Sequence, residues 1–125
     1  MNPEINPEIN PEMNQDMNDI LLVLTNLPDE ASAAKLARQL VETHAAACVS
    51  RLAPCISTYR WQNSIEIATE IPLLIKPSRA AYPLLEKLLR EAHPYELPEI
   101  IAVPVTAGLP AYLDWVREQT AILED

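Results

Sequence analysis

The order of apolar patterns along the chain predicts an α+β protein with a ferredoxin-like sandwich. Apolar runs of strand length and helical stripes follow one another as strand, helix, strand, strand, helix, strand, and a further helix ends the chain. Split β-α-β units of this kind form an antiparallel sheet in the order 4-1-3-2, with both main helices on one face. A length of 125 residues and an apolar content of 49% suit one packed domain.

The first strand and helix are predicted from a continuous apolar run and the polar residues after it. Residues 20–25 are apolar except for Thr25, which is typical of an interior strand that is covered on both faces. Residues 28–30, Pro-Asp-Glu, begin a helix with a carboxylate at its positive end. Because the helices cover only one face of the predicted sheet, we expect an oligomer partner on the other.

Residues 46–76 predict a long hairpin made by the second and third strands. The outgoing strand is broken at Pro54, where we expect a bend or bulge. Asn63 lies in the short turn and tolerates a positive φ. Pro72 lies in the returning strand, residues 65–76, and predicts a bulge there because proline has no N–H to donate.

The sequence from Ser78 onward predicts a helix, an edge strand and a terminal helix. Ser78 is suited to cap the second helix, but Pro83 fits only a first turn, so the helix should begin after Ser78. Residues 100–105 follow as a strand, and Pro104 favours an edge position. Gly108 ends this strand. A short terminal helix is indicated by Tyr112, Trp115 and Val116.

Residues 1–18 differ from the rest of the chain. They begin with a four-residue Asn-Pro-Glu repeat, and residues 1–19 carry five acids and no base. Such a tract buries too little to offset its ordering entropy. We therefore expect a disordered acidic tail at 1–18 and a folded domain at 19–125. A metal-scavenging or partner-binding arm is the alternative.

Charge and cysteine content restrict the partners and the compartment. The net charge is −9 and no basic patch is present, which argues against a nucleic-acid partner. No run is long enough and apolar enough to cross a membrane, and the N-terminal residues lack signal-peptide features. Cys48 and Cys55 would lie about 23 Å apart on one strand, beyond the reach of a disulfide. Free thiols favour the cytoplasm.

Residues 93–100, His-Pro-Tyr-Glu-Leu-Pro-Glu-Ile, form the densest cluster of reactive side chains. Two prolines four positions apart exclude a helix here and push the residue before each toward extended geometry. The segment therefore forms a corner between the second helix and the last strand. Loops on rigid elements often carry functional sites.

Several short motifs follow one another between about residues 20 and 120. They are Pro28-Asp29-Glu30, Ala46-Ala47-Cys48-Val49, Ser57, Tyr59, Trp61, Glu70, Leu74-Ile75-Lys76, His93-Pro94-Tyr95, Pro98-Glu99-Ile100, Pro104-Val105, Gly108, Tyr112-Leu113 and Trp115. Taken in this order, they resemble the CutA (divalent-cation tolerance) family. The resemblance implies a compact ferredoxin-like homotrimer, similar to the PII signalling proteins, whose hairpins pair sheet edges around a threefold axis.

The resemblance also implies a copper site, but this chain departs from it. The family's copper ligands are a cysteine that ends the first strand and a His-His pair before the proline. Thr25 and Ala92 occupy two of these positions, so only His93 remains. Copper(II) needs several nitrogen, oxygen or sulfur donors. We therefore expect only weak or indirect binding of Cu²⁺ or another divalent cation.

Four residues are candidate metal ligands: His93, Glu96, Glu99 and Cys48. Each also has a structural interpretation. His93 ends a helix, where it can bond a carbonyl. Glu96 can be solvated and Glu99 can pair locally, while Cys48 can be buried as a small hydrophobic residue.

Five further residues are predicted to line an inter-subunit ligand cleft or a trimer interface: Tyr59, Trp61, Lys76, Tyr95 and Trp115. For the aromatic residues, simple packing is the alternative. No Ser-His-acid set, phosphate-binding glycine loop or zinc-type cysteine pair is present, so we do not expect an enzyme. Three functions stay open: divalent-cation tolerance, PII-like ligand binding, and a scaffold for a partner protein.

Overall fold

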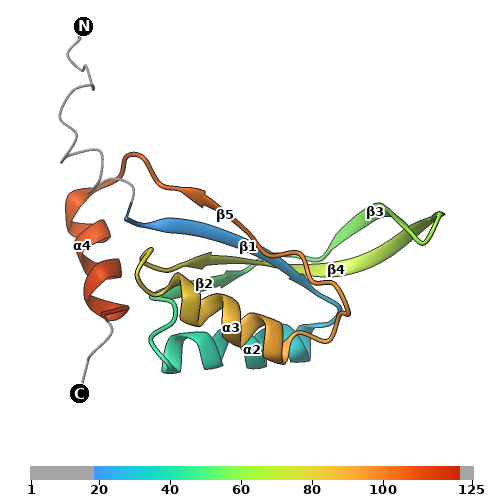
Figure 1. Cartoon of the computed structure of the whole chain (residues 1–125), viewed down its shortest axis with the longest axis horizontal. Helices are drawn as coiled ribbons and strands as arrows, with labels where there is room; N and C mark the ends of the chain where they lie inside the picture. Colours follow the sequence, from blue (N-terminus) through green and yellow to red (C-terminus); the bar gives the residue numbers. More distant parts are fainter. Residues whose placement is uncertain (1–18, 122–125) are drawn as a thin grey trace, which may run out of the picture.

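The computed structural model describes residues 19–121 (Figure 1). The expectation of a disordered tail at 1–18 lies outside the described residues, as does the end of the predicted domain, 122–125. The elements, with the labels of Figure 1, are β1 (Leu21–Leu27), α2 (Glu30–Glu42), β2 (Cys48–Arg51), β3 (Cys55–Trp61), β4 (Ser64–Lys76), α3 (Tyr82–Ala92), β5 (Ile101–Pro104) and α4 (Pro110–Gln119).

The sheet is antiparallel, with the order β2-β4-β1-β5, and β3 pairs with the other half of β4. Since β2 and β3 together are the predicted second strand, the predicted order 4-1-3-2 is confirmed. Central β1 places Val23 opposite Ile75 of β4 on one side and opposite Ala102 of β5 on the other. The fold is the predicted ferredoxin-like α+β sandwich.

A bulge separates β2 from β3, as the two prolines predict. Arg51 lies opposite Leu73, and Cys55 lies opposite Glu70, so residues 52–54 face only residues 71–72. The Leu52 N–H donates to the Pro72 carbonyl at 2.9 Å within this bulge. Because a bulge bends and twists its strand, the β3–β4 hairpin projects beyond the helices (Figure 1).

Local capping fixes where the helices begin. The Asp29 carboxylate accepts from the Ser32 N–H at 2.8 Å at the start of α2. The Ser78 hydroxyl accepts from the Ala81 N–H at 3.2 Å, and α3 begins at Tyr82 with Pro83 in its first turn. The later start predicted from Pro83 is confirmed.

Both main helices cover the same face of the sheet, and the main core lies between them and β1 and β4 (Figure 1). Helix α4 packs against Ile20 at one end of the sheet, and the rest of the other sheet face is less well covered. There Leu22 and Leu24 are half-buried, and Ile101 and Val103 of β5 are 51% and 46% exposed. The single chain therefore covers β1 fully on one face and only partly on the other. We call this uncovered surface the open sheet face.

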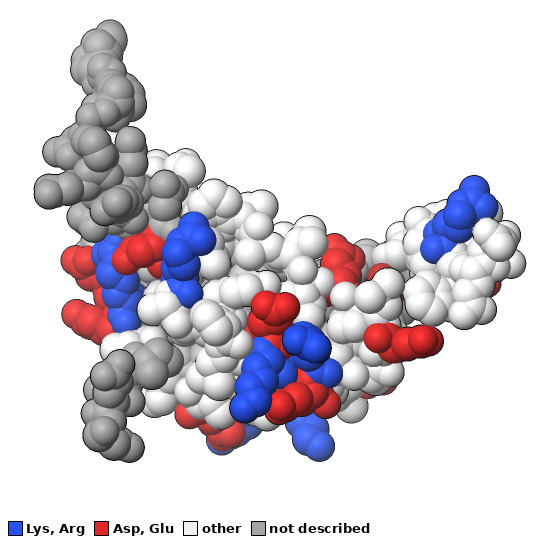
Figure 2. Space-filling view, viewed as in Figure 1, with Lys and Arg blue, Asp and Glu red and all other residues white. Residues whose placement is uncertain are grey.

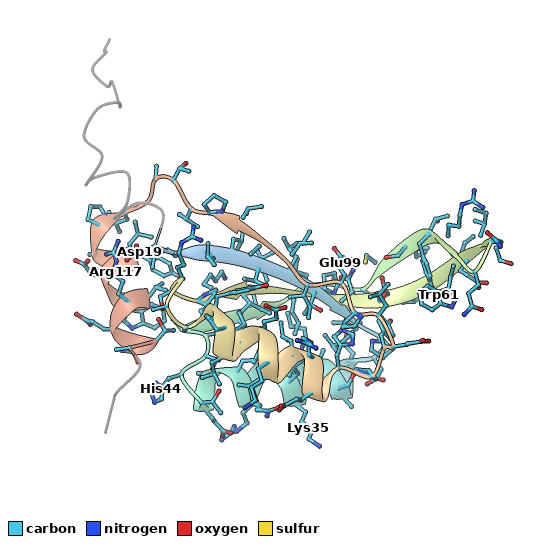
Figure 3. All side chains as sticks on the ribbon, viewed as in Figure 1. Asp19, Lys35, His44, Trp61, Glu99 and Arg117 are labelled. Atoms are coloured by element: carbon cyan, nitrogen blue, oxygen red, sulfur yellow. The ribbon has the colours of Figure 1, made fainter. Side chains whose placement is uncertain are left out.

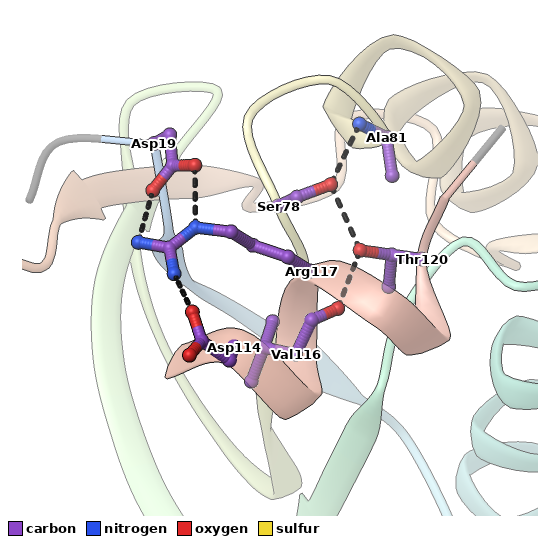
Figure 4. A network of polar contacts seen from close by, with 7 residues as sticks. All are labelled: Asp19, Ser78, Ala81, Asp114, Val116, Arg117 and Thr120. Atoms are coloured by element: carbon purple, nitrogen blue, oxygen red, sulfur yellow. Dashed lines mark hydrogen bonds and ion pairs between the residues drawn. The ribbon is translucent and has the colours of Figure 1, made fainter. Parts of the chain in front are cut away.

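The terminal helix α4 is fastened to the end of the sheet by polar contacts (Figure 4). The Arg117 guanidinium donates to both oxygens of Asp19, at 2.7 and 3.0 Å, and to Asp114 at 2.7 Å. Beside it, the buried Thr120 hydroxyl lies 2.8 Å from the hydroxyl of Ser78. Helix α4 is thereby joined to the residues that precede both β1 and α3.

Candidate functional site

A cleft of about 800 Å³ lies between the projecting hairpin and the proline corner. We call it the corner cleft. In Figure 3, Trp61 on the hairpin and Glu99 at the corner mark its two walls. It is lined by Asn26, Ser57, Thr58, Tyr59, Arg60, Trp61, Glu70, Pro94, Tyr95, Glu96, Leu97 and Glu99.

The hairpin wall is built by strand alternation and by its turn. Tyr59 and Trp61 share one face of β3, and the pairing of Cys55 with Glu70 places Glu70 on the same face of β4. The tip holds Gln62 and Asn63 at φ of 51° and 68°. Two consecutive positive φ angles are typical of the tight turns that match strand twist. The positive φ predicted for Asn63 is confirmed, and Gln62 adopts one as well.

The corner wall is fixed by His93, whose side chain is only 7% exposed. Its Nδ1 accepts from the Tyr95 N–H at 3.2 Å, so its Nε2–H donates to the Asn26 carbonyl at 2.8 Å. Burial lowers the pKa of His93, against the opposing effects of that carbonyl and of Glu70. Both ring nitrogens of the neutral imidazole are therefore occupied within the protein.

Glu70 and Tyr95 join the two walls of the cleft. The Tyr95 hydroxyl donates to Glu70 Oε2 at 2.9 Å, and Glu70 is only 8% exposed. Burial raises the pKa of Tyr95, and the Glu70 carboxylate raises it further. The Tyr95 ring also lies 4.9 Å from the His93 ring, centroid to centroid. On the same wall, the Asn26 amide donates to Glu99 Oε1 at 3.0 Å.

The structure divides the predicted site residues into two places. Tyr59, Trp61, Tyr95, Glu96 and Glu99 come together in the corner cleft, and His93 lies buried behind Tyr95. The remaining predicted residues, Cys48, Lys76 and Trp115, do not line the cleft.

Cys48 and Lys76 form a neighbouring pair across β2 and β4, at the end of the sheet near α4. The Lys76 ammonium lies 3.6 Å from Cys48 Sγ and 2.8 Å from Ser50 Oγ. Trp115 lies on α4, with its ring 5.6 Å from that of Tyr112. Lys76 is six residues along β4 from Glu70, about 20 Å away in an extended strand.

Sequence reasoning missed Asn26 and Arg60 as cleft residues. Asn26 is the first polar amide after the apolar run of β1, and that change in polarity was the available signal. Its two contacts, with His93 and Glu99, link positions 67 and 73 residues apart and depend on the folded topology. Arg60 carried no signal beyond its place in the hairpin.

The residues that are present do not reproduce the copper site implied by the resemblance. Thr25 is 1% exposed, its hydroxyl has no hydrogen-bond partner within the described chain, and a hydroxyl is a poor substitute for a thiolate. Ala92 offers no donor. Within residues 19–121, no three His, Cys, Asp or Glu side chains are grouped closely enough to hold a metal ion.

None of the helices between residues 19 and 121 is long and apolar enough to span a membrane.

Fold and cleft together define a small ferredoxin-like α+β protein with a projecting hairpin and a corner cleft. The family model for the CutA1 divalent ion tolerance protein matches residues 21–119, and the chain belongs to this family. The divalent-cation tolerance protein CutA of Thermus thermophilus is 41% identical over 99 residues, which cover 79% of this chain and 96% of that protein.

Further relatives support the same assignment. The human protein CutA is 40% identical over 98 residues, 78% of this chain and 55% of that protein. The crystal structure of CutA from Xylella fastidiosa superposes with a TM-score of 0.80 at 44% identity, and covers 82% of this chain and 98% of that one. A structure described as the periplasmic divalent cation tolerance protein CutA of Archaeoglobus fulgidus is 30% identical, with a TM-score of 0.78 over 82% of this chain and 98% of that one.

Proposed function

We propose that the protein is a homotrimeric divalent-cation tolerance protein and not an enzyme. It responds to metal ions, copper among them, by weak or indirect metal handling at the corner cleft. The observation that carries this proposal is the pair of exposed carboxylates, Glu96 and Glu99, in a cleft whose histidine has both nitrogens occupied. The names of the relatives support the tolerance role.

Weak binding follows from the donors that remain. Carboxylate oxygens bind divalent cations, but Glu99 already accepts from Asn26, and Glu70 already accepts from Tyr95. An imidazole ligand requires His93 to give up one of its two hydrogen bonds. Cu²⁺ or another divalent cation would then replace existing contacts instead of filling a prepared site. Cys48 lies too far along the sheet to join these donors.

The trimer is supported by the open sheet face. Ile101 and Val103 expose much of their apolar side chains beside Leu22 and Leu24, and β5 carries no charged residue. Figure 2 shows mixed charges over α2 and α3 and few around β5. Contiguous apolar surface of this kind is usual at interfaces between subunits. No nucleic acid or membrane enters this proposal.

A cytoplasmic location is proposed from the two free thiols. Cys48 and Cys55 are both partly exposed and unpaired with each other, a state that a reducing compartment preserves. The relative from A. fulgidus is described as periplasmic. Fractionation of the source cells, with the protein followed by antibody, tests the location directly.

Calorimetric titration of Cu²⁺, with Zn²⁺ for comparison, tests the metal role on the full chain. We expect weak, saturable Cu²⁺ binding that is lost in the Glu96→Gln/Glu99→Gln double variant and kept in Glu118→Gln, a matched change on α4. Any binding by residues 1–18 is common to all three proteins. Equal Cu²⁺ binding by the double variant would remove the cleft from metal handling.

A second candidate function is favoured by the size and lining of the cleft. A volume of about 800 Å³ with three aromatic residues is typical of small-molecule sites. This supports a PII-like module that binds a ligand between subunits. A scaffold role predicts neither metal nor ligand binding, and instead a protein partner in a pull-down.

A further inference from the structure

Glu70 is an unusual residue for the wall of a cleft, because it is a carboxylate that is 92% buried and forms no ion pair within residues 19–121. Its Oε2 accepts from the Tyr95 hydroxyl, while its Oε1 has no hydrogen-bond donor within residues 19–121. No ion pair is formed by Glu70 in that part of the chain. Burial of a charge is costly unless it is paired. Glu70 therefore provides an unused acceptor oxygen at the cleft.

The surroundings of Glu70 favour positive charge. Two more carboxylates, Glu96 and Glu99, line the cleft against one guanidinium, that of Arg60. The faces of aromatic rings attract cations, and Tyr59, Trp61 and Tyr95 contribute three rings to the same lining. A cleft that combines a buried carboxylate with several rings has the composition of an ammonium-binding site.

A bare metal ion suits this lining less well than an organic cation does. Metal dications need several oxygen, nitrogen or sulfur donors at short distance. Within the described residues, no three His, Cys, Asp or Glu side chains are grouped closely enough to hold one. A quaternary alkylammonium group has no N–H to donate and is weakly hydrated. It is stabilised by ring faces and by one carboxylate at longer range, without tight coordination.

We propose that the corner cleft binds a small organic cation, an alkylammonium ligand whose charge is neutralised by Glu70 and whose alkyl groups contact Tyr59, Trp61 and Tyr95. This inference rests on the second candidate function, ligand binding in the cleft, and names its ligand class. It is independent of copper handling by Glu96 and Glu99.

Two probes of nearly equal shape test the charge preference. Choline carries a quaternary ammonium, and 3,3-dimethylbutan-1-ol carries a neutral tert-butyl group in its place. The chain has two tryptophans, so the Trp115→Phe variant leaves Trp61 as the sole indole reporter in the full-length protein. We expect saturable quenching of Trp61 by choline, and affinity for the alcohol that is at least about tenfold lower.

Three variants assign that binding to named residues. Glu70→Gln keeps an amide oxygen that accepts from Tyr95 but removes the charge, and we expect about tenfold weaker choline binding. Trp61→Leu removes the ring and keeps an apolar side chain, so calorimetry should show at least about fivefold weaker binding. Glu118→Gln, on α4 outside the cleft, should bind choline with unchanged affinity.

Several results would overturn the proposal. These are equal affinity for choline and the alcohol, no saturable response to choline, and choline binding that Glu70→Gln leaves unchanged. A lysine of a second copy that neutralises Glu70 would also block choline and overturn it. Saturable quenching of Trp61 by glutarate, without choline binding, would keep the cleft as a ligand site and reject the cationic class. The Cu²⁺ titration decides metal handling separately.

Discussion

Asn26 connects the corner to the central strand through both its backbone and its side chain. Its carbonyl accepts from His93 and its amide donates to Glu99, so one residue of β1 sets the position of two corner residues. His93 in turn accepts the Tyr95 N–H, which directs the Tyr95 hydroxyl to Glu70. The cleft wall is thus a chain of hydrogen bonds that starts in the sheet.

At His93, this chain of bonds predicts a pH dependence of stability. The folded pKa of His93 lies below its unfolded value of about 6.5, so the unfolded chain takes up the proton first as pH falls. The stabilisation is complete above about pH 6.5 and is lost as pH falls from there toward the folded pKa. Urea unfolding at pH 7.5 and pH 5.5, at fixed protein concentration, should show a larger loss in wild type than in His93→Gln.

The second histidine provides the control for this pH effect. His44 is exposed and its Nδ1 lies 2.9 Å from the Gln119 carbonyl oxygen. His44→Gln should retain the wild-type difference between the two pH values. If His93→Gln loses as much stability as wild type between pH 7.5 and 5.5, the drop belongs to carboxylates elsewhere and not to His93.

Thr25 predicts the opposite kind of effect, a gain in stability from a lost polar group. Its hydroxyl is buried without a partner within the described chain, and valine has the same shape without that oxygen. Thr25→Val should raise the free energy of unfolding by about 1 kcal/mol. Thr25→Ser keeps the hydroxyl, removes a methyl group and should lower it by about 1 kcal/mol. Urea midpoints measure both, and a lower midpoint for Thr25→Val would show that the hydroxyl is satisfied.

Sequence alone could identify the corner but not its internal bonding. His93, Tyr95, Glu96 and Glu99 are neighbours in the chain, and the two prolines that shape the segment are visible in the same stretch. The burial of His93 depends on packing against β1, which no local pattern encodes. Strand register pairs Cys48 with Lys76 near α4, away from the corner. No local pattern encodes that register, so sequence alone does not separate these two residues from the site.

At the scale of elements, proline positions carried much of the fold prediction. Pro54 and Pro72 predicted the break and bulge that separate β2 from β3, because proline lacks an N–H. Pro83 and Pro104 likewise predicted the late start of α3 and the edge position of β5. The polar fastening of α4 was not predicted, since Asp19 and Arg117 lie 98 residues apart.

The hairpin tip predicts a stabilising substitution. Gln62 holds a φ of 51°, a left-handed conformation that costs a residue with a Cβ about 1 kcal/mol. Gln62→Gly removes this cost and should raise the free energy of unfolding by up to about 1 kcal/mol. Ser64→Gly, in the adjoining strand, should lower it by about 0.5 kcal/mol. Thermal unfolding of both variants checks the contrast, and equal destabilisation would argue against strain at Gln62.

On the whole-molecule scale, the apolar first strand and the one-sided helices require a second covering layer. A strand with apolar residues on both faces is stable only when both faces leave water. Helices α2 and α3 cover one face, and the open sheet face is left with the side chains of Leu22, Leu24, Ile101 and Val103. The proposed trimer supplies that layer, and it would also set the environment of the corner cleft.

Assembly through the open sheet face predicts that a charge buried there dissociates the trimer. Val103→Glu places a carboxylate on the open sheet face, where a subunit interface would have to bury it unpaired in every copy. The cost of burying such charges is several kcal/mol per ion, enough to dissociate the trimer at micromolar concentration. Val41→Glu, on the exposed surface of α2, is the matched control and should stay trimeric. Light scattering on diluted samples measures both masses. A trimer mass for Val103→Glu, or a monomer mass for the wild type, would show that the open sheet face is not the subunit interface.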